Sequence, residues 1–293
     1  MFLPNNYSFV SILCEGGSGT LMICEDKQSN KQCVAKLMSF ENKRSKQSFK
    51  NEVEILEELK GCPNIINIVE HESHSAYGCI ILPRMKCDLM DILESVEKFE
   101  EKAAKGIFYQ ICLAVKACHD HDIAHLDIKP ENILHSYEGN FYLADFGGAR
   151  KIFDPNYEVE NIMITRAYSA PELRNVGSLQ IQPLAADIWS LGIVLFSLLT
   201  GAWPFTNIDS LTPDTPVTFV HPFIPPQVES LLRDIFQRDP AARPNIDQIL
   251  AHPWFVSTTK TKRCRRASFL QKLDFKNTID SLSSRVKHFR DRI

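Results

Sequence analysis

The spacing of apolar residues changes near Pro83, from the alternation of β-strands to the three- and four-residue spacing of helices. Before that point, the runs SFVSIL, LMIC, CVAKLM and GCIIL are rich in β-branched and apolar residues, which is typical of strands. Helical spacing follows over residues 88–98, 100–119, 187–200, 227–237 and 246–251. We therefore predict an α+β fold in two lobes, the first small and β-rich and the second larger and mainly helical.

One helix interrupts the β-rich part, over residues 45–60. Its apolar residues lie three and four positions apart, and Gly61 and Pro63 end the pattern. Glu52 lies beside this apolar stripe, so its carboxylate is expected near the core. The pattern over residues 187–200 is apolar on every side, which is typical of a helix buried at the centre of a domain.

Composition excludes several kinds of protein. The nine cysteines are scattered, odd in number and free of the C-x-x-C spacing, which argues against a disulfide framework and a structural zinc site. The longest apolar run, IWSLGIVLFSLL, is shorter than a bilayer requires, and the first residues lack the pattern of a signal peptide. We expect reduced thiols and a cytoplasmic or nuclear location, without a membrane or nucleic-acid partner.

Charge is divided unevenly along the chain. Residues from Ser257 onward carry a net charge of +8, and the remainder carries −11. This basic tail, residues 256–293, also contains an amphipathic helical pattern formed by Phe275, Ile279, Leu282, Val286, Phe289 and Ile293. We expect the tail to dock on the acidic body, with Ser268 in KRCRRASFL as a regulatory residue. A solvated basic linker, or an amphipathic helix that binds a calmodulin-like partner or a membrane surface, remains an alternative.

A glycine-rich segment, CEGGSGTL, lies between two predicted strands. Glycines allow a sharp turn and a close approach to a ligand, and the exposed amides can bind phosphate oxygens, although most such segments are simple turns. Lys36 follows inside an apolar strand. Its ammonium group either reaches solvent at the end of the side chain or faces a bound phosphate. In the second case, the carboxylate of Glu52 could orient it.

The segments HLDIKPENIL and LADFGGAR combine four polar side chains that suit phosphoryl transfer. Asp127 can accept a proton from a hydroxyl nucleophile, and Lys129 can neutralise phosphate charge. Asn132 and Asp145 offer oxygen ligands of the kind that Mg²⁺ prefers. Each of them alone could be an ordinary turn residue, but the order and spacing together favour a phosphoryl-transfer site.

With these motifs the chain resembles a eukaryotic protein kinase catalytic domain over residues 7–255. The resemblance implies an N-lobe of residues 7–82, a hinge of residues 83–87 and a C-lobe of residues 88–255. It also rests on DFG (145–147), APE (170–172), DIWSLG beginning at Asp187, RDPAARP with Arg243, and HPWF. These motifs imply that Asp187 braces the catalytic loop and that Arg243 pairs with Glu172.

The resemblance also assigns roles to residues. It implies ATP and Mg²⁺ as cofactors, Asp127 as catalytic base, Lys129, Lys36 and Glu52 as further catalytic residues, and Asn132 and Asp145 as metal ligands. Leu82 is the expected gatekeeper beside the hinge. The implied nucleotide-binding residues are Leu13, Cys14, Glu15, Gly16, Gly17, Ser18, Gly19, Thr20, Leu21, Ala35, Lys36, Leu82, Met85 and Leu134.

DIKPEN and TRAYSAPE resemble serine/threonine kinases, and the whole pattern is most similar to the calcium/calmodulin-dependent and AMP-activated group. Thr165 then lies near the base. Asp88 and Glu131 match positions at which basophilic kinases bind arginines before the acceptor. The resemblance therefore implies protein substrates with basic residues near the serine or threonine.

Two positions depart from the family pattern. Cys14 replaces the first glycine of the loop, and Leu126 replaces the arginine of the usual H-R-D. A leucine offers no hydrogen-bond donor to a phosphorylated activation loop. A pseudokinase that binds without phosphoryl transfer is the rival hypothesis, but the complete reactive set disfavours it. A small-molecule kinase is disfavoured by APE and DIWSLG.

Overall fold

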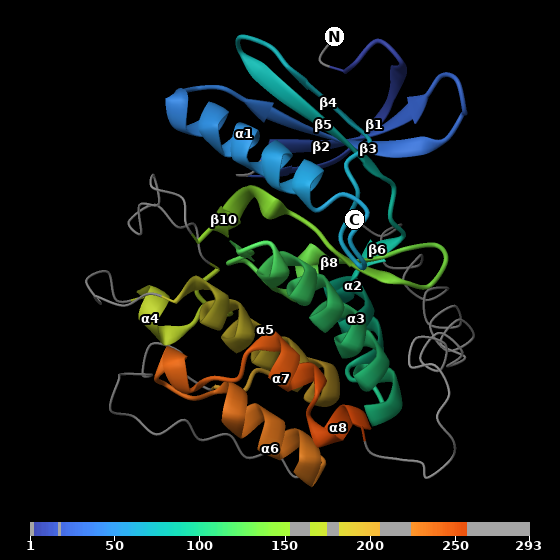
Figure 1. The fold of residues 1–293 in the computed structure, drawn as a ribbon. Coiled ribbons are helices and arrows are strands. Elements are labelled where there is room, and N and C mark those ends of the chain that lie inside the picture. The colour runs from blue at the N-terminus through green and yellow to red at the C-terminus, as the bar shows by residue number, and fades with distance from the viewer. Residues whose placement is uncertain (1–2, 17–18, 153–164, 175–181, 206–223, 257–293) are drawn as a thin grey trace.

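The computed structural model describes residues 3–16, 19–152, 165–174, 182–205 and 224–256. A sheet with one long helix forms the upper part of the molecule, and a group of helices forms the lower part (Figure 1). The predicted α+β fold in two lobes is therefore confirmed. The basic tail beyond Val256, with Ser268, lies outside the described residues.

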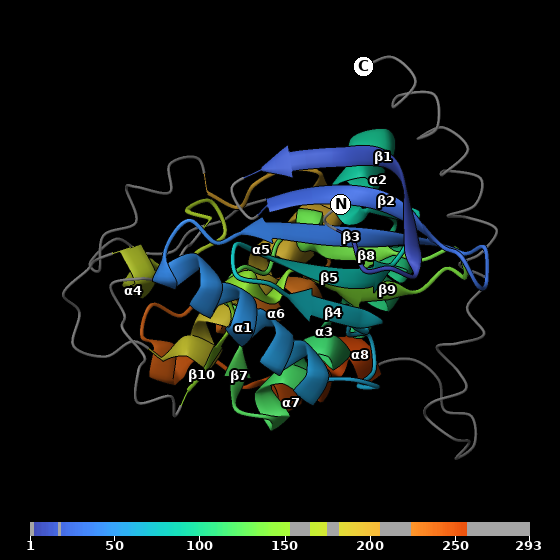
Figure 2. The same cartoon turned by 90° about the horizontal axis from the view of Figure 1, so that it is seen from above.

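The N-lobe is built on an antiparallel five-stranded sheet. Its spatial order is β1-β2-β3-β5-β4, which can be followed across Figure 2. The strands are β1 (Tyr7–Gly16), β2 (Gly19–Asp26), β3 (Gln32–Ser39), β4 (Glu70–Ser73) and β5 (Tyr77–Pro83). The sequence pattern predicted four of them and missed β4, which is short and consists mainly of polar residues.

Helix α1 (Lys43–Glu58) is the single helix expected in this lobe. Asn42 caps it, because its side chain accepts hydrogen bonds from the backbone N–H groups of Arg44 and Ser45. The helix buries Phe49, Val53 and Leu56 together with Glu52. An acidic side chain is thus carried into the interior on an otherwise apolar helix face, which requires a charged partner there.

The C-lobe consists mainly of helices around one hydrophobic core. The helices are α2 (Leu89–Val96), α3 (Glu101–Asp120), α4 (Pro171–Arg174), α5 (Pro183–Thr200), α6 (Pro226–Ile235), α7 (Ile246–Leu250) and α8 (Pro253–Val256). Short strands β6 (Cys87–Asp88), β8 (Ile133–His135) and β9 (Phe141–Leu143) form one small sheet, and β7 (Ile123–Ala124) pairs with β10 (Arg150–Lys151). These small sheets hold the segments on which the motif residues lie.

Helix α5 is the buried central helix, and it is longer than the sequence pattern indicated. It begins at Pro183, four residues before the predicted start, because proline suits the first helical position, where its missing N–H needs no partner. At 18 residues the helix is long and apolar enough to cross a membrane by length and composition, although the run IWSLGIVLFSLL within it was expected to be too short. However, 78% of it is buried within the lobe, as expected of a core helix.

Candidate active site

Three charged side chains from different elements meet between the lobes. Lys36 on β3 places its Nζ 2.6 Å from Glu52 Oε1 of α1 and 2.7 Å from Asp145 Oδ1. Lys36 and Glu52 are 5% and 1% exposed, so neither charge is solvated. A buried charge is tolerated only when it is paired, and here the lysine holds two carboxylates at one point.

Lys36 and Asp145 stabilise each other's charge, whereas burial raises the pKa of Glu52 although it is paired with Lys36. Burial by itself would lower the pKa of Lys36, but Glu52 and Asp145 outweigh it, so the pKa lies above its usual range. For Asp145, burial acts in the opposite direction and raises the pKa. The charge and hydrogen bond of Lys36 lower it, and the net pKa lies below its usual value. At neutral pH the site therefore contains a cationic Lys36 and an ionised Asp145.

Asp127 lies at the centre of a second cluster. Thr165 donates its hydroxyl to Asp127 Oδ1 at 2.6 Å, and Lys129 Nζ lies 2.8 Å from Asp127 Oδ2. Asn132 Nδ2 donates to the same carboxylate oxygen at 2.9 Å, and Lys129 Nζ donates to the Thr165 hydroxyl at 2.9 Å. An alcohol therefore fits between this carboxylate and the lysine, within hydrogen-bond distance of both.

A buried aspartate holds the loop that carries Asp127. Asp187 of α5 is completely buried, and its two oxygens accept hydrogen bonds from the backbone N–H groups of His125 and Leu126, each at 2.8 Å. The side chain of His119 lies 3.1 Å from the same carboxylate. This brace fixes the backbone immediately before Asp127, as the resemblance implied.

Leu126 has an unusual backbone conformation, with φ of +65°. This left-handed region is unfavourable for a leucine, at a cost of about 1 to 3 kcal/mol, so the hydrogen bond that the Leu126 N–H donates to Asp187 must hold it. The side chain is 4% exposed and belongs to the hydrophobic core. At this position the loop therefore contributes an apolar side chain to the core and no charged group.

A cavity of about 430 Å³ adjoins the lysine cluster and is lined by residues of both lobes. Glu52, Asp88, Glu131, Asn132 and Asp145 also line it. Of the expected nucleotide-binding residues, the structure places nine in its walls: Leu13, Cys14, Gly16, Gly19, Leu21, Lys36, Leu82, Met85 and Leu134. Apolar walls together with the cationic Lys36 suit a ligand with a flat apolar part and an anionic part.

The structure corrects the assignment of Ala35. Ala35 is fully buried in a separate cluster with Met22 and Ile81, whereas its neighbour Val34 lines the cavity. The reason is the alternation of side chains along a strand, which puts Val34 and Lys36 on one face of β3 and Ala35 on the other. The expected Glu15 and Thr20 also do not line the cavity, and Gly17 and Ser18 lie outside the described residues.

The two described glycines of the loop differ in what they contribute. Gly19 has φ of +121°, and a Cβ there would lie 2.3 Å from the carbonyl oxygen of Leu37, so the fold itself requires glycine. A Cβ at Gly16 would meet nothing within 4 Å. Protein packing therefore does not explain Gly16, but close approach of a ligand to this backbone would.

The expected metal ligands have the right chemistry for a hard cation. Asn132 Nδ2 donates to the main-chain oxygen and the carboxylate of Asp127, which leaves its amide oxygen as the group for a ligand. Asp145 is ionised and adopts a left-handed backbone conformation with φ of +60°. Amide and carboxylate oxygens of this kind fit Mg²⁺, which binds proteins through one or two such groups together with phosphate and water.

The expected substrate-binding residues lie near this site. Asp88 lines the cavity and also caps α2, since its Oδ1 accepts the Asp91 N–H at 2.8 Å. Glu131 is exposed and accepts a hydrogen bond from the Tyr168 hydroxyl. Burial, followed by the charge of Glu131, raises the pKa of Tyr168, so the tyrosine stays neutral.

The family model described as the protein kinase domain matches residues 7–255. The chain belongs to the protein kinase family. Kinases of this family generally use ATP and a divalent metal, which fits the cavity and the oxygen ligands beside it. The ion pair between Arg243 and Glu172, at 2.6 and 2.8 Å, joins the two family motifs as expected.

The curated relatives named below are all protein kinases. The chain is 29% identical to serine/threonine-protein kinase PEPKR2 of Arabidopsis thaliana over 88% of its length, and 28% identical to calcium-dependent protein kinase 22 of the same plant over 96%. It is 30% identical to the carbon catabolite-derepressing protein kinase of Secale cereale over 85%. The chain spans only 55%, 63% and 51% of the lengths of these three relatives.

Several residues of this protein kinase site were missed by sequence reasoning. Ile66 and Ala144 line the cavity, and the backbone N–H of Asp127 lies 3.3 Å from His125 Nδ1. His125 Nε2 lies 3.0 Å from the carbonyl oxygen of Ala144, and its ring packs edge-on against Phe146. His125 thus links the two motif segments. Its place in the run HLD was the one signal that could have suggested this.

Proposed function

We propose that this protein kinase transfers the terminal phosphoryl group of ATP to serine or threonine hydroxyls of protein substrates. The observation that carries the proposal is the hydroxyl of Thr165, which donates to Asp127 at 2.6 Å while Lys129 donates to it at 2.9 Å. A substrate hydroxyl needs the same two neighbours, a proton acceptor and a cation.

In this mechanism Asp127 orients the acceptor hydroxyl and receives its proton. Lys129 lies 2.8 Å from the same carboxylate and is placed to neutralise charge on the group being transferred. Asp187 keeps both residues in position by holding the backbone before them. Little covalent chemistry is required of the protein, because phosphoryl transfer depends mainly on position and charge.

Lys36 and the cavity bind the nucleotide in this proposal. Lys36, held by Glu52, extends its charge to the end of the cavity at which Asp145 and Asn132 lie. These last two residues would hold Mg²⁺, which supplies positive charge to the phosphate oxygens when bound. Leu21, Val34 and Leu134 provide apolar walls for the base.

The substrate preference is proposed to be basic. On an array of serine and threonine peptides incubated with ATP and Mg²⁺, we expect enrichment of arginine or lysine before the acceptor, because Asp88 and Glu131 place carboxylates at the cavity. The Asp127→Asn protein serves as the background control. An array without that enrichment would contradict the preference. An array without any phosphorylation above background would favour a pseudokinase.

We also propose that the basic tail regulates the kinase by docking on its body, with Ser268 as the regulatory residue. The opposite charges of tail and body, +8 and −11, support this. A chain truncated after Phe255 is then expected to show a higher kcat/KM for basic peptides, because the tail no longer competes with them. An unchanged kcat/KM would remove the proposal.

A calmodulin-like partner for the tail is compatible with the calcium-dependent relative, and adding such a partner to the full chain would test it.

A further inference from the structure

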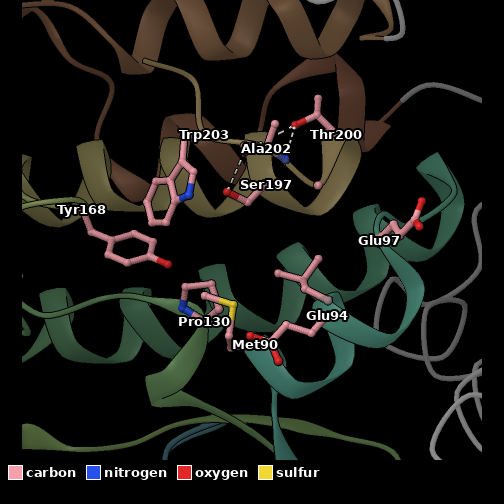
Figure 3. A pocket seen from close by; sticks show the side chains of 11 residues that line it. Met90, Glu94, Glu97, Pro130, Tyr168, Ser197, Thr200, Ala202 and Trp203 are labelled. Atoms are coloured by element: carbon pink, nitrogen blue, oxygen red, sulfur yellow. Dashed lines mark hydrogen bonds between the residues drawn. The ribbon is translucent and has the colours of Figure 1, made fainter. Parts of the chain in front are cut away.

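A second cavity, of about 450 Å³, lies in the C-lobe below the catalytic loop. In Figure 3, Tyr168 and Trp203 stand together at one end, Glu97 stands at the other, and Met90 and Glu94 lie on the side of α2. Pro130 of the catalytic loop forms part of the wall. The nucleotide mechanism above uses none of these side chains.

The lining of this cavity is acidic and aromatic. Glu94 and Glu97 are its charged residues, and no lysine, arginine or histidine is among the described residues that line it. Neither glutamate forms an ion pair with any residue in the described part of the chain. Trp203 is 47% exposed, and its ring lies 4.7 Å from that of Tyr168. Such a lining suits a cation on an apolar stem, because the stem packs on the aromatic ring while the charge meets the carboxylates.

The walls of the cavity are held together by the fold. Gly201 has φ of +68°, and a Cβ there would lie 2.1 Å from the carbonyl oxygen of Glu97, so the ends of α5 and α2 are in direct contact. The Phe99 N–H also donates to the carbonyl oxygen of Leu198 at 2.8 Å. The hydroxyl of Ser197 donates to the Ala202 carbonyl oxygen (Figure 3). The cavity is thus formed before any ligand binds, which reduces the entropy cost of binding.

The cavity lies within reach of a peptide bound at Asp127. Pro130 is three residues after Asp127, so their Cα atoms are at most about 11 Å apart. An extended peptide advances about 3.3 Å per residue. A substrate therefore reaches this wall within about three residues of its acceptor, and the cavity continues from there to Glu94 and Glu97 (Figure 3).

We propose that this cavity is a substrate subsite that binds an arginine or lysine located about three to seven residues from the phosphorylated serine or threonine. The inference rests on the proposed function and deepens it, because it assigns a second, more distant basic determinant to residues other than Asp88 and Glu131. Glu94 and Glu97 bind the cation, and Trp203 covers its stem.

The first test is a peptide series with a single serine, in which one arginine is moved from two to eight residues away on either side and is replaced by alanine in the matched peptide. With the wild-type protein, one position within the proposed range gives the highest kcat/KM. In the Glu94→Gln/Glu97→Gln protein, the advantage of that arginine peptide over its alanine counterpart falls about tenfold, mainly through KM.

The matched control is Glu54→Gln/Glu57→Gln, two exposed glutamates of α1 with the same spacing and the same change in net charge. The control keeps the full arginine advantage. If both double variants keep it at every position, the subsite inference is wrong.

The second test measures binding without catalysis. Trp203 is the exposed member of three tryptophans, since Trp189 and Trp254 are both fully buried. The arginine peptide is expected to protect the tryptophan fluorescence of the Asp127→Asn protein from acrylamide quenching, and the Trp203→Phe variant abolishes that protection. Protection without phosphorylation by the wild-type protein would refute the proposed kinase activity but keep the cavity as a cation site. Equal quenching with and without peptide would overturn the cavity inference, even if the kinase is active.

Discussion

Replacing Asp127 with asparagine is expected to lower kcat for peptide phosphorylation by about 10²- to 10⁴-fold, the usual contribution of a general base. Asparagine keeps the shape of the side chain but cannot accept the proton of the acceptor hydroxyl. The hydroxyl of Thr165, 2.6 Å from Asp127 Oδ1, marks where that proton would be transferred. The rate is measured with saturating ATP and a basic peptide.

Two measurements separate lost chemistry from lost structure. ATP binding to the Asp127→Asn protein is expected to remain, because Asp127 is not among the residues that line the nucleotide cavity. The control is Asp247→Asn on α7, which removes an exposed carboxylate paired with Lys116 and leaves kcat unchanged. A kcat of the Asp127→Asn protein within about threefold of the wild-type value would show that Asp127 is not the catalytic base, because a general base contributes far more than that.

Replacing Arg243 with methionine is expected to destabilise the protein by about 3 to 5 kcal/mol, the effect of removing one member of a buried ion pair. The arginine side chain is fully buried, and Glu172 would keep its charge inside the lobe without this partner. Arg243 also donates to the carbonyl oxygens of Ala185 and Gln237 and lies over the ring of Trp189. The measurement is the free energy of unfolding in urea, followed by fluorescence and by circular dichroism.

The matched control breaks a surface pair. Arg233 and Glu229 on α6 are paired at 2.6 Å, but their side chains are 57% and 43% exposed. Arg233→Met should therefore cost less than about 1 kcal/mol. Replacing both members of the buried pair, Arg243→Met with Glu172→Leu, should recover part of the lost stability, because no charge is then left unpaired. Equal losses for the two single arginine variants would show that burial does not strengthen the pair with Glu172.

The sequence was sufficient where the information is local. Helices α1, α3 and α6 lie within two residues of their predicted bounds, since the periodicity of apolar residues directly reports the buried face of a helix. Helix α5 was predicted too short because the prediction began at Asp187, although Leu184, Ala185 and Ala186 before it are also apolar and Pro183 is a typical first residue of a helix.

The order and spacing of the motif residues also identified the protein kinase family before any coordinates. Only the tertiary structure decided which residues meet. Val34 rather than Ala35 lines the cavity, because the face of a strand depends on what the sheet packs against. Lys36 and Asp145 are 109 positions apart and lie 2.7 Å from each other, and Glu97 and Trp203 line one cavity although they are 106 positions apart. Periodicity is a local property, whereas such contacts depend on the packing of whole elements, which no short stretch of the chain specifies.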